Sequence, residues 1–249
     1  MPIRQHRPLR KLSLDIFHAA GLPKEDARVI SEHLVDSNLA GHDSHGVWCL
    51  PRYVPAMREK YVRWEERNIL REAPCLTVID CKGGNGIVAT THALDIAVEK
   101  ARQTTFGFVG LHNTTHICRL GDYTPRMAEQ GMIGLVWLNG GGLFMTPNGS
   151  SDRRLCPEPI SFGAPRRNGA PFMLDMTMTT VAGGKIEQKI VRDDPMPDNW
   201  VIDQTGKSVT NAKEFHDRSA ETGVPPLGDR KTTRLHSSHS EIPYAVFCL

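Results

Sequence analysis

Apolar residues recur every three or four positions through the N-terminal part of the chain, a pattern typical of amphipathic helices. This spacing predicts one helix over residues 9–20, which ends at Gly21, and a second that begins at Pro23, because proline is favoured in the first turn of a helix. Gly41 is expected to end the second helix, and residues 52–59 are expected to form a third. The predicted buried side of the second helix carries Val29, Ile30, His33 and Leu34.

Short apolar runs in the middle of the chain predict strands. Two helical patterns separate the first three runs, one over residues 91–102 with Thr91 as its cap and one that ends at Gly131. The order β-α-β-α-β-β-β indicates a mixed α/β fold. Residues 61–72 are expected to be an exposed polar linker. The predicted strands cover residues 75–80, 106–113, 132–139, 160–165 and 172–177.

The chain has 249 residues, enough for one large domain or two small ones. Its 30 Lys and Arg against 28 Asp and Glu give a net charge of +2, which recruits neither nucleic acid nor anionic lipid. No apolar run is long enough to span a bilayer, and the basic start lacks the apolar core of a signal peptide. The six scattered cysteines form no C-x-x-C pair, so we expect free thiols in a reducing, cytoplasmic compartment.

The residues Gly84, Gly86 and Ala89 fit the G-x-G-x-x-A pattern of dinucleotide-binding loops, between a predicted strand and a helix. The acidic residue that should follow about twenty positions later is missing. A tight strand-to-helix turn explains the glycines equally simply, and we favour that interpretation.

Two polar clusters follow predicted elements, at residues 41–53 and 112–118. Open α/β sheets place ligands at such strand ends. Either His112 or His116 alone is typical of a structural histidine, but two polar clusters at the ends of elements favour a shared site. A metal site is the alternative, although no standard zinc spacing is present. Its candidate ligands are His42, Asp43, His45, His112, His116 and Cys118.

The motifs GHDSHGV, LPRY, HNTTHI, RLGDY, IGLVWLN, ISFGAP and LDMTMTTVAGGKI occur in an order that resembles the malate/L-lactate dehydrogenase family, over residues 5–228. The resemblance implies an NAD- or NADP-dependent oxidoreductase of 2-hydroxyacids such as malate or lactate, acting as a homodimer. It also implies an α/β (α+β) fold with a mixed, mainly antiparallel sheet wrapped by helices, which is not a Rossmann domain. The glycine pattern would then be unrelated to cofactor binding.

The same resemblance assigns roles to residues. It implies that His116 is the proton donor and acceptor, since an imidazole is well matched to proton transfer near neutral pH. It places His45 and Ser44 in the substrate pocket, with His45 also on the nicotinamide side, and Tyr53 on the substrate. The residues expected to contact the cofactor are Asn139, Leu174, Asp175 and Met176.

The chain departs from the family pattern at several positions. Cys49 stands where family members commonly carry an arginine that clamps the substrate carboxylate. Arg52 or Arg119 could supply that charge, and either could equally be a surface arginine. Cys118 replaces a usual glycine, and Pro157 enters a loop that normally lacks it, which changes the backbone angles allowed near the site.

The resemblance suggests three regions. Residues 1–74 form a helical segment for the substrate site and dimer, and residues 75–228 an incomplete cofactor-binding domain. Residues 229–249 match a translated sequencing adapter better than the family, so we expect a non-native tail that is disordered or weakly docked. A catalytically inactive relative is the alternative function, and a metal-dependent hydrolase is a more distant one.

Overall fold

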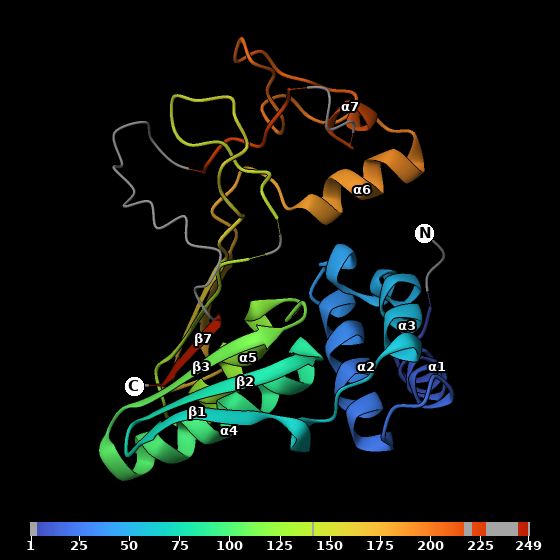
Figure 1. Cartoon of the computed structure of the whole chain (residues 1–249). Coiled ribbons are helices and arrows are strands. Elements are labelled where there is room, and N and C mark those ends of the chain that lie inside the picture. The colour runs from blue at the N-terminus through green and yellow to red at the C-terminus, as the bar shows by residue number, and fades with distance from the viewer. Residues whose placement is uncertain (1–3, 141, 217–220, 228–243, 249) are drawn as a thin grey trace. The chain divides into compact units, whose positions relative to one another are not determined.

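The computed structural model describes residues 4–140, 142–216, 221–227 and 244–248 (Figure 1). The chain divides into two compact units. The first comprises Met1–Trp137, Ser161–Leu174 and Pro243–Leu249, and the second comprises Leu138–Ile160 and Asp175–Ile242. The predicted boundaries at residues 74 and 228 stay a prediction.

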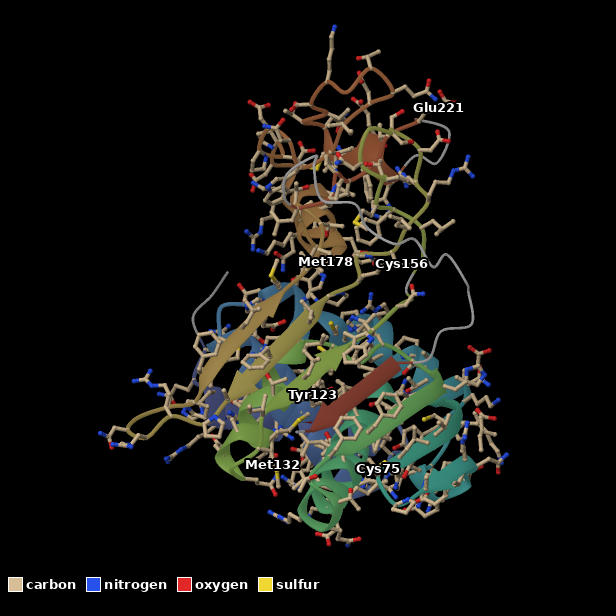
Figure 2. The ribbon with its side chains drawn as sticks, turned by 90° about the vertical axis from the view of Figure 1, so that its left-hand side faces the viewer. Cys75, Tyr123, Met132, Cys156, Met178 and Glu221 are labelled. Atoms are coloured by element: carbon tan, nitrogen blue, oxygen red, sulfur yellow. The ribbon has the colours of Figure 1, made fainter. Side chains whose placement is uncertain are left out.

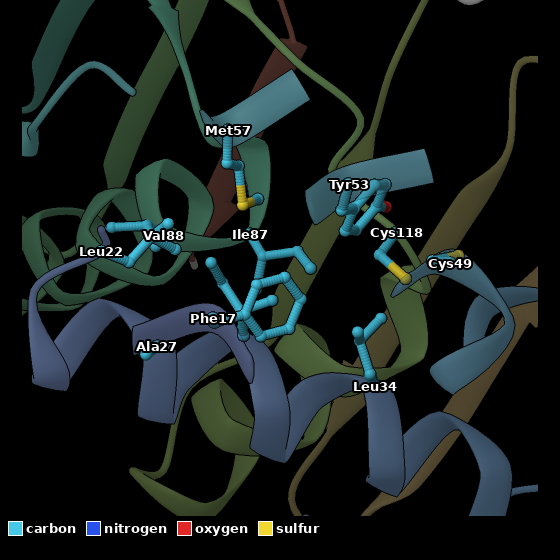
Figure 3. Packing of buried hydrophobic residues seen from close by; sticks show 11 residues of the cluster. Phe17, Leu22, Ala27, Leu34, Cys49, Tyr53, Met57, Ile87, Val88 and Cys118 are labelled. Carbon is cyan, nitrogen blue, oxygen red and sulfur yellow. The ribbon is translucent and has the colours of Figure 1, made fainter. Parts of the chain in front are cut away.

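Three helices open the first unit, as the apolar spacing predicts. They are α1 (His6–Ala19), α2 (Lys24–Leu39) and α3 (Leu50–Glu59). Two short 3-10 turns, η1 (Asp43–His45) and η2 (Val47–Cys49), connect α2 to α3 and carry the first polar cluster. The apolar faces of these helices pack with the start of a later helix into one core (Figure 3). That core contains Phe17, Leu22, Ala27, Ile30, Leu34, Cys49, Tyr53, Met57, Ile87, Val88 and Cys118.

The sheet has seven strands in the order β1-β2-β3-β7-β4-β5-β6. Strands β2 and β3 are parallel, whereas β1 with β2, β3 with β7 and β4 with β7 are antiparallel. This confirms the predicted mixed, mainly antiparallel sheet. The strands are β1 (Asn68–Ala73), β2 (Leu76–Gly84), β3 (Gly107–Thr114), β4 (Gly134–Trp137), β5 (Ile160–Ala164), β6 (Phe172–Met176) and β7 (Tyr244–Cys248).

Strand β1 corrects one prediction. Residues 61–72 do not form a plain linker, because η3 (Trp64–Glu66) and most of β1 fall within them. Five of the six residues of β1 are exposed, so its sequence shows no apolar alternation, and its pairing with β2 defines it. Of the predicted tail, residues 229–243 lie outside the described residues, and Tyr244–Cys248 forms β7 between β3 and β4.

Helices α4 (Gly86–Thr104) and α5 (Tyr123–Glu129) pack on the sheet through β3 and β4 (Figure 1). The start of α4 corrects the predicted cap at Thr91. Asn85 caps this helix, because its side-chain oxygen accepts the amide hydrogens of Ile87 and Val88. The hydroxyl of Thr91 lies inside the helix and donates to the carbonyl of Ile87.

The second unit contains α6 (Gly183–Arg192), α7 (Ala212–His216) and long connecting segments, and Figure 2 labels Cys156, Met178 and Glu221 within it. No helix in the described part of the chain is long and apolar enough to cross a membrane. The core of this unit consists of Val181, Ile186, Met196, Val201, Val209, Ala212, Phe215 and Val224.

Candidate active site

Asn38, at the end of α2, shapes the turn that carries the first polar cluster. Its side-chain amide donates to the Asp43 carboxylate at 2.6 Å, and its carbonyl oxygen accepts the Val47 amide at 2.9 Å. Gly46 leaves the space that this contact needs, because a Cβ there would lie 2.2 Å from the Asn38 oxygen. The Asn38 side chain therefore fixes the turn through Asp43 and Val47, and this turn presents Ser44 and His45.

The glycine pattern between β2 and α4 seats the second polar cluster. The Gly86 amide donates to the Thr115 hydroxyl, and the Thr115 amide donates to the Gly84 carbonyl, both at 3.0 Å. A Cβ on Gly86 would lie 2.3 Å from the Thr115 carbonyl oxygen and 2.6 Å from that of His116. Gly84 and Gly86 therefore make a tight strand-to-helix turn that lets the His116 loop approach closely.

His116 lies against side chains from α3 and from the first cluster. The hydroxyl of Tyr53 is 2.5 Å from His116 Nδ1, and Nη2 of Arg52 is 3.3 Å from the same atom. The ring centroid of His45 is 5.6 Å from that of His116. An arginine can only donate hydrogen bonds, so Nδ1 is the acceptor and the proton of the neutral His116 ring resides on Nε2.

His45 is held by its neighbours in both clusters. The Ser44 hydroxyl lies 3.0 Å from His45 Nδ1, and the Cys118 thiol donates to the His45 carbonyl at 3.1 Å. The structure thus brings together five of the predicted site residues, namely Ser44, His45, Arg52, Tyr53 and His116.

Desolvation by the surrounding protein favours the neutral form of both imidazoles. It lowers the pKa of His116 to about 3, with further lowering by His45, Arg52 and His33. Burial likewise lowers the pKa of His45 to about 4, with smaller contributions from His42, His33 and the two arginines at 52 and 119. Burial raises the pKa of Tyr53, so its hydroxyl keeps its proton and can donate to His116.

The free energy of unfolding should fall as the pH drops below about 6.5, the ordinary histidine value. Between that pH and about 3, the unfolded chain binds a proton at His116 that the folded chain excludes, and above it the contribution is complete. Urea unfolding at pH 7 and pH 5, of the protein and of His116→Gln, checks this. A stability difference between the two proteins that stays constant with pH would contradict it.

Two cysteines, Cys49 and Cys118, lie beside each other at one end of the core in Figure 3. The Cys49 thiol is 3.5 Å from the Ser44 carbonyl, and Nη2 of Arg52 is 4.0 Å from the Cys49 sulfur. Arg52 thus reaches the space beside position 49. Cys118 has a φ of +65°, a left-handed conformation that favours glycine, which is the residue expected at this position from the family pattern.

Arg119 belongs to a buried polar network and is only 8% exposed. Its Nε donates to the Ser37 hydroxyl at 3.3 Å, its Nη2 lies 3.4 Å from Asp122, and its amide donates to His33 Nε2 at 3.2 Å. Sequence reasoning did not identify His33, Ser37 or Asp122 as site residues. The helical spacing placed His33 on a buried face but gave no sign of its partner, which lies 86 positions later.

The remaining predicted residues occupy other places. Leu174 lies on β6, at the edge of the sheet, and its carbonyl accepts the Ser161 hydroxyl. Asn139, Asp175 and Met176 belong to the second unit, and their part in a cofactor site stays a prediction. Within the described residues, no three histidine, cysteine, aspartate or glutamate side chains gather in a way that could hold a metal ion.

Comparison with known sequences gives one family. The profile described as malate/L-lactate dehydrogenase matches residues 5–237. A malate dehydrogenase of Pyrococcus abyssi is 35% identical over 84% of this chain and 56% of its own length. An L-sulfolactate dehydrogenase of Methanocaldococcus jannaschii is 31% identical over 89% of this chain and 63% of its own. The chain therefore spans little more than half the length of these relatives.

Solved structures share the fold. The malate dehydrogenase of Pyrococcus horikoshii has a TM-score of 0.79 and 28% identity, over 99% of this chain and 74% of that one. A malate dehydrogenase from Entamoeba histolytica has a TM-score of 0.87, over 99% of this chain and 78% of its own, at 19% identity. Because the sequence profile covers most of the chain and these structures follow its fold, the chain belongs to the malate/L-lactate dehydrogenase family.

Proposed function

We propose that the whole protein is an NAD- or NADP-dependent dehydrogenase of 2-hydroxyacids, in which His116 exchanges a proton with the substrate oxygen at Nε2. One observation carries the proposal. Tyr53 and Arg52 both contact Nδ1 of the His116 imidazole, so Nε2 is the nitrogen left for the substrate. Proton transfer to or from the oxygen is the step that the protein must supply in this reaction.

We assign the carboxylate clamp to Arg52. Its guanidinium is exposed on α3, contacts His116 and reaches the space beside Cys49, where relatives commonly carry the clamping arginine. Arg119, the other candidate, is buried against Asp122 and Ser37. A bidentate pair between a guanidinium and a carboxylate fixes both the position and the orientation of an acid substrate.

The same contact links substrate binding to proton transfer. A carboxylate that pairs with Arg52 draws the guanidinium from Nδ1 and removes one of the charges that lower the His116 pKa. In reduction, His116 can then take up a proton and donate it from Nε2. In oxidation the ring must instead carry its single proton on Nδ1, where the Tyr53 oxygen turns to accept it, and the unprotonated Nε2 then accepts the hydroxyl proton.

The bound nicotinamide supplies the hydride, which passes to or from the carbinol carbon. Residues 174–176 fit a contact with a dinucleotide, because β6 is the terminal strand of the sheet and an edge strand offers backbone N–H and C=O groups outward. Asn139 and His45 are proposed beside the ring. The proposal includes a cytoplasmic homodimer.

Substrate class follows from the relatives' names, which include malate, L-sulfolactate and hydroxycarboxylate dehydrogenases. The full-length protein should oxidise NADH or NADPH in the presence of at least one 2-oxoacid, with oxaloacetate, pyruvate and sulfopyruvate as the panel. No oxidation of either cofactor with any of them would reject the proposal in favour of an inactive relative.

Arg52→Ala in the full-length protein should raise KM for the 2-oxoacid by roughly 10- to 100-fold, because it removes a charge-assisted contact worth about 1.5–3 kcal/mol. KM for the cofactor should stay within about threefold. Arg58→Ala is the matched control, since Arg58 is an exposed arginine on the same helix. An unchanged KM for the acid in Arg52→Ala would place the clamp elsewhere.

A further inference from the structure

Behind the loop that carries His116 lies a buried ionic network drawn from three elements. His33 and Ser37 come from α2, Arg119 and Asp122 from the loop and the short turn that follow His116, and Arg126 from α5. His33 is 1% exposed, and Arg119 and Asp122 are each 8% exposed. Charged side chains are seldom buried this far without a role that holds structure or function in place.

Asp122 is the centre of the network. Its Oδ2 lies 3.1 Å from His33 Nδ1 and 2.7 Å from Arg126 Nη2, while its Oδ1 lies 3.4 Å from Arg119 Nη2. Burial alone would raise the pKa of Asp122. His33 and the two arginines outweigh it and hold the pKa below its ordinary value, so Asp122 is a carboxylate.

The two ring nitrogens of His33 have opposite roles. Nε2 accepts the backbone amide hydrogen of Arg119 at 3.2 Å, so it carries no proton. The ring proton must then be on Nδ1, which lies at ion-pair distance from the Asp122 carboxylate but without the alignment of a hydrogen bond. The nearby negative charge of Asp122 thus favours the Nδ1–H tautomer of His33, and that tautomer is the one able to hold the Arg119 amide.

The loop is secured at two more points between His116 and Arg119. The Tyr123 hydroxyl donates to the Ile117 carbonyl at 2.6 Å, and Figure 2 labels Tyr123 in the first unit. The Cys118 thiol donates to the His45 carbonyl. The contacts of Ile117 and Arg119 lie on either side of Cys118, whose left-handed backbone is unfavourable for a residue other than glycine. The amide held by His33 is the last of the three.

We propose that His33, oriented by Asp122, is a positioning residue for the proton-transfer site: it holds the Arg119 amide and thereby fixes the loop that presents His116. The inference rests on the proposed function for its effect on catalysis, but its effect on the loop is independent of any activity. His33 touches neither substrate nor cofactor in this role.

His33→Leu keeps much of the volume but removes the acceptor, which leaves the Arg119 amide without a partner. Hydrogen exchange, followed by mass spectrometry in the full-length protein, should be about 10- to 100-fold faster in a peptide covering residues 112–121. Exchange in a peptide covering α4 should stay unchanged. The kcat for 2-oxoacid reduction should fall by about the same factor, and KM for the cofactor should not.

His33→Gln tests the acceptor itself, because the Gln carbonyl oxygen can reach the place of Nε2. It should restore protection of residues 112–121 and bring kcat to within about threefold of the natural protein. Glu32→Gln is the control, because Glu32 is a half-buried neighbour on α2 whose carboxylate pairs with Arg28 and not with the network, and it should change neither.

The outcomes separate the two proposals. Unchanged exchange in residues 112–121 of His33→Leu would overturn the positioning role, as would equal acceleration in every helix, which would mean that His33 supports the whole fold. Failure of the natural protein to reduce any 2-oxoacid would reject the proposed function, and the exchange result would still decide the role of His33.

Discussion

Replacing His116 with alanine is expected to lower kcat for 2-oxoacid reduction by roughly 100- to 10,000-fold, the usual contribution of a general acid–base residue. The variant loses the only nitrogen that we assign to proton exchange with the substrate oxygen. The protein should still fold, because Tyr53 and Arg52, which contact His116, also lie beside each other, the guanidinium 5.3 Å from the Tyr53 ring centroid. Steady-state kinetics with near-ultraviolet circular dichroism would measure both.

His112→Ala is the matched control for that experiment. His112 lies four positions earlier, on β3, and is absent from the contacts around Tyr53. Removing the His112 side chain should leave kcat within about threefold of that of the natural protein. Added imidazole should partly restore activity to His116→Ala, because a small base can enter the space of the missing ring. If His112→Ala lost activity while His116→Ala kept the kcat of the natural protein, the assignment would be overturned.

Gly86→Ala is the second change expected to have a large effect. The added Cβ would lie 2.3 Å and 2.6 Å from two backbone carbonyl oxygens of the His116 loop, neither of which can rotate away. The fold should lose about 3 kcal/mol or more. Molecules that remain folded should lose roughly a hundredfold in kcat, because the loop must shift and His116 moves with it.

Gly83→Ala separates this steric effect from backbone strain. Gly83 has a φ of +87° with nothing within 4 Å of the added Cβ, so it should cost only about 1–2 kcal/mol of left-handed strain. Its kcat should equal that of the natural protein at temperatures where both are folded. Denaturant unfolding and kinetics on all three proteins check the prediction. Equal kcat in Gly86→Ala and Gly83→Ala would show that the loop tolerates the change.

Elements with a clear apolar period could be predicted from the sequence. Helices α1 and α2 begin and end within a few residues of their predicted bounds, because each buries one face and ends near a glycine. The strands around residues 75–80 and 106–113 were also found, since they are short apolar runs in the sheet.

Elements defined by their partners could not be predicted. Strand β1 is exposed along nearly its whole length, and only its hydrogen bonds to β2 make it a strand. The start of α4 at Gly86 depends on Asn85 as the cap and on a loop that arrives from thirty positions later. Thr91 is of a residue type that often caps helices, but α4 begins before it, at Gly86.

In the candidate site, too, the residues could be predicted from the sequence but their tertiary contacts could not. The sequence motifs identify His45, Tyr53 and His116, and the structure brings them together. The motifs assign Tyr53 to the substrate, whereas its hydroxyl contacts His116 Nδ1, an interaction that joins residues 63 positions apart. The role of Asn38 in shaping the His45 turn likewise depends on tertiary contacts.

The occupied Nδ1 of His116 also governs how this residue responds to chemical labels. Reagents that acylate imidazole attack through the ring nitrogen bearing the lone pair, and here that nitrogen faces Tyr53 and Arg52. Acylation will therefore mark exposed histidines such as His6 and His18 and pass over His116. The low reactivity of His116 towards such reagents would result from its contacts with Tyr53 and Arg52, and it is compatible with proton exchange at Nε2.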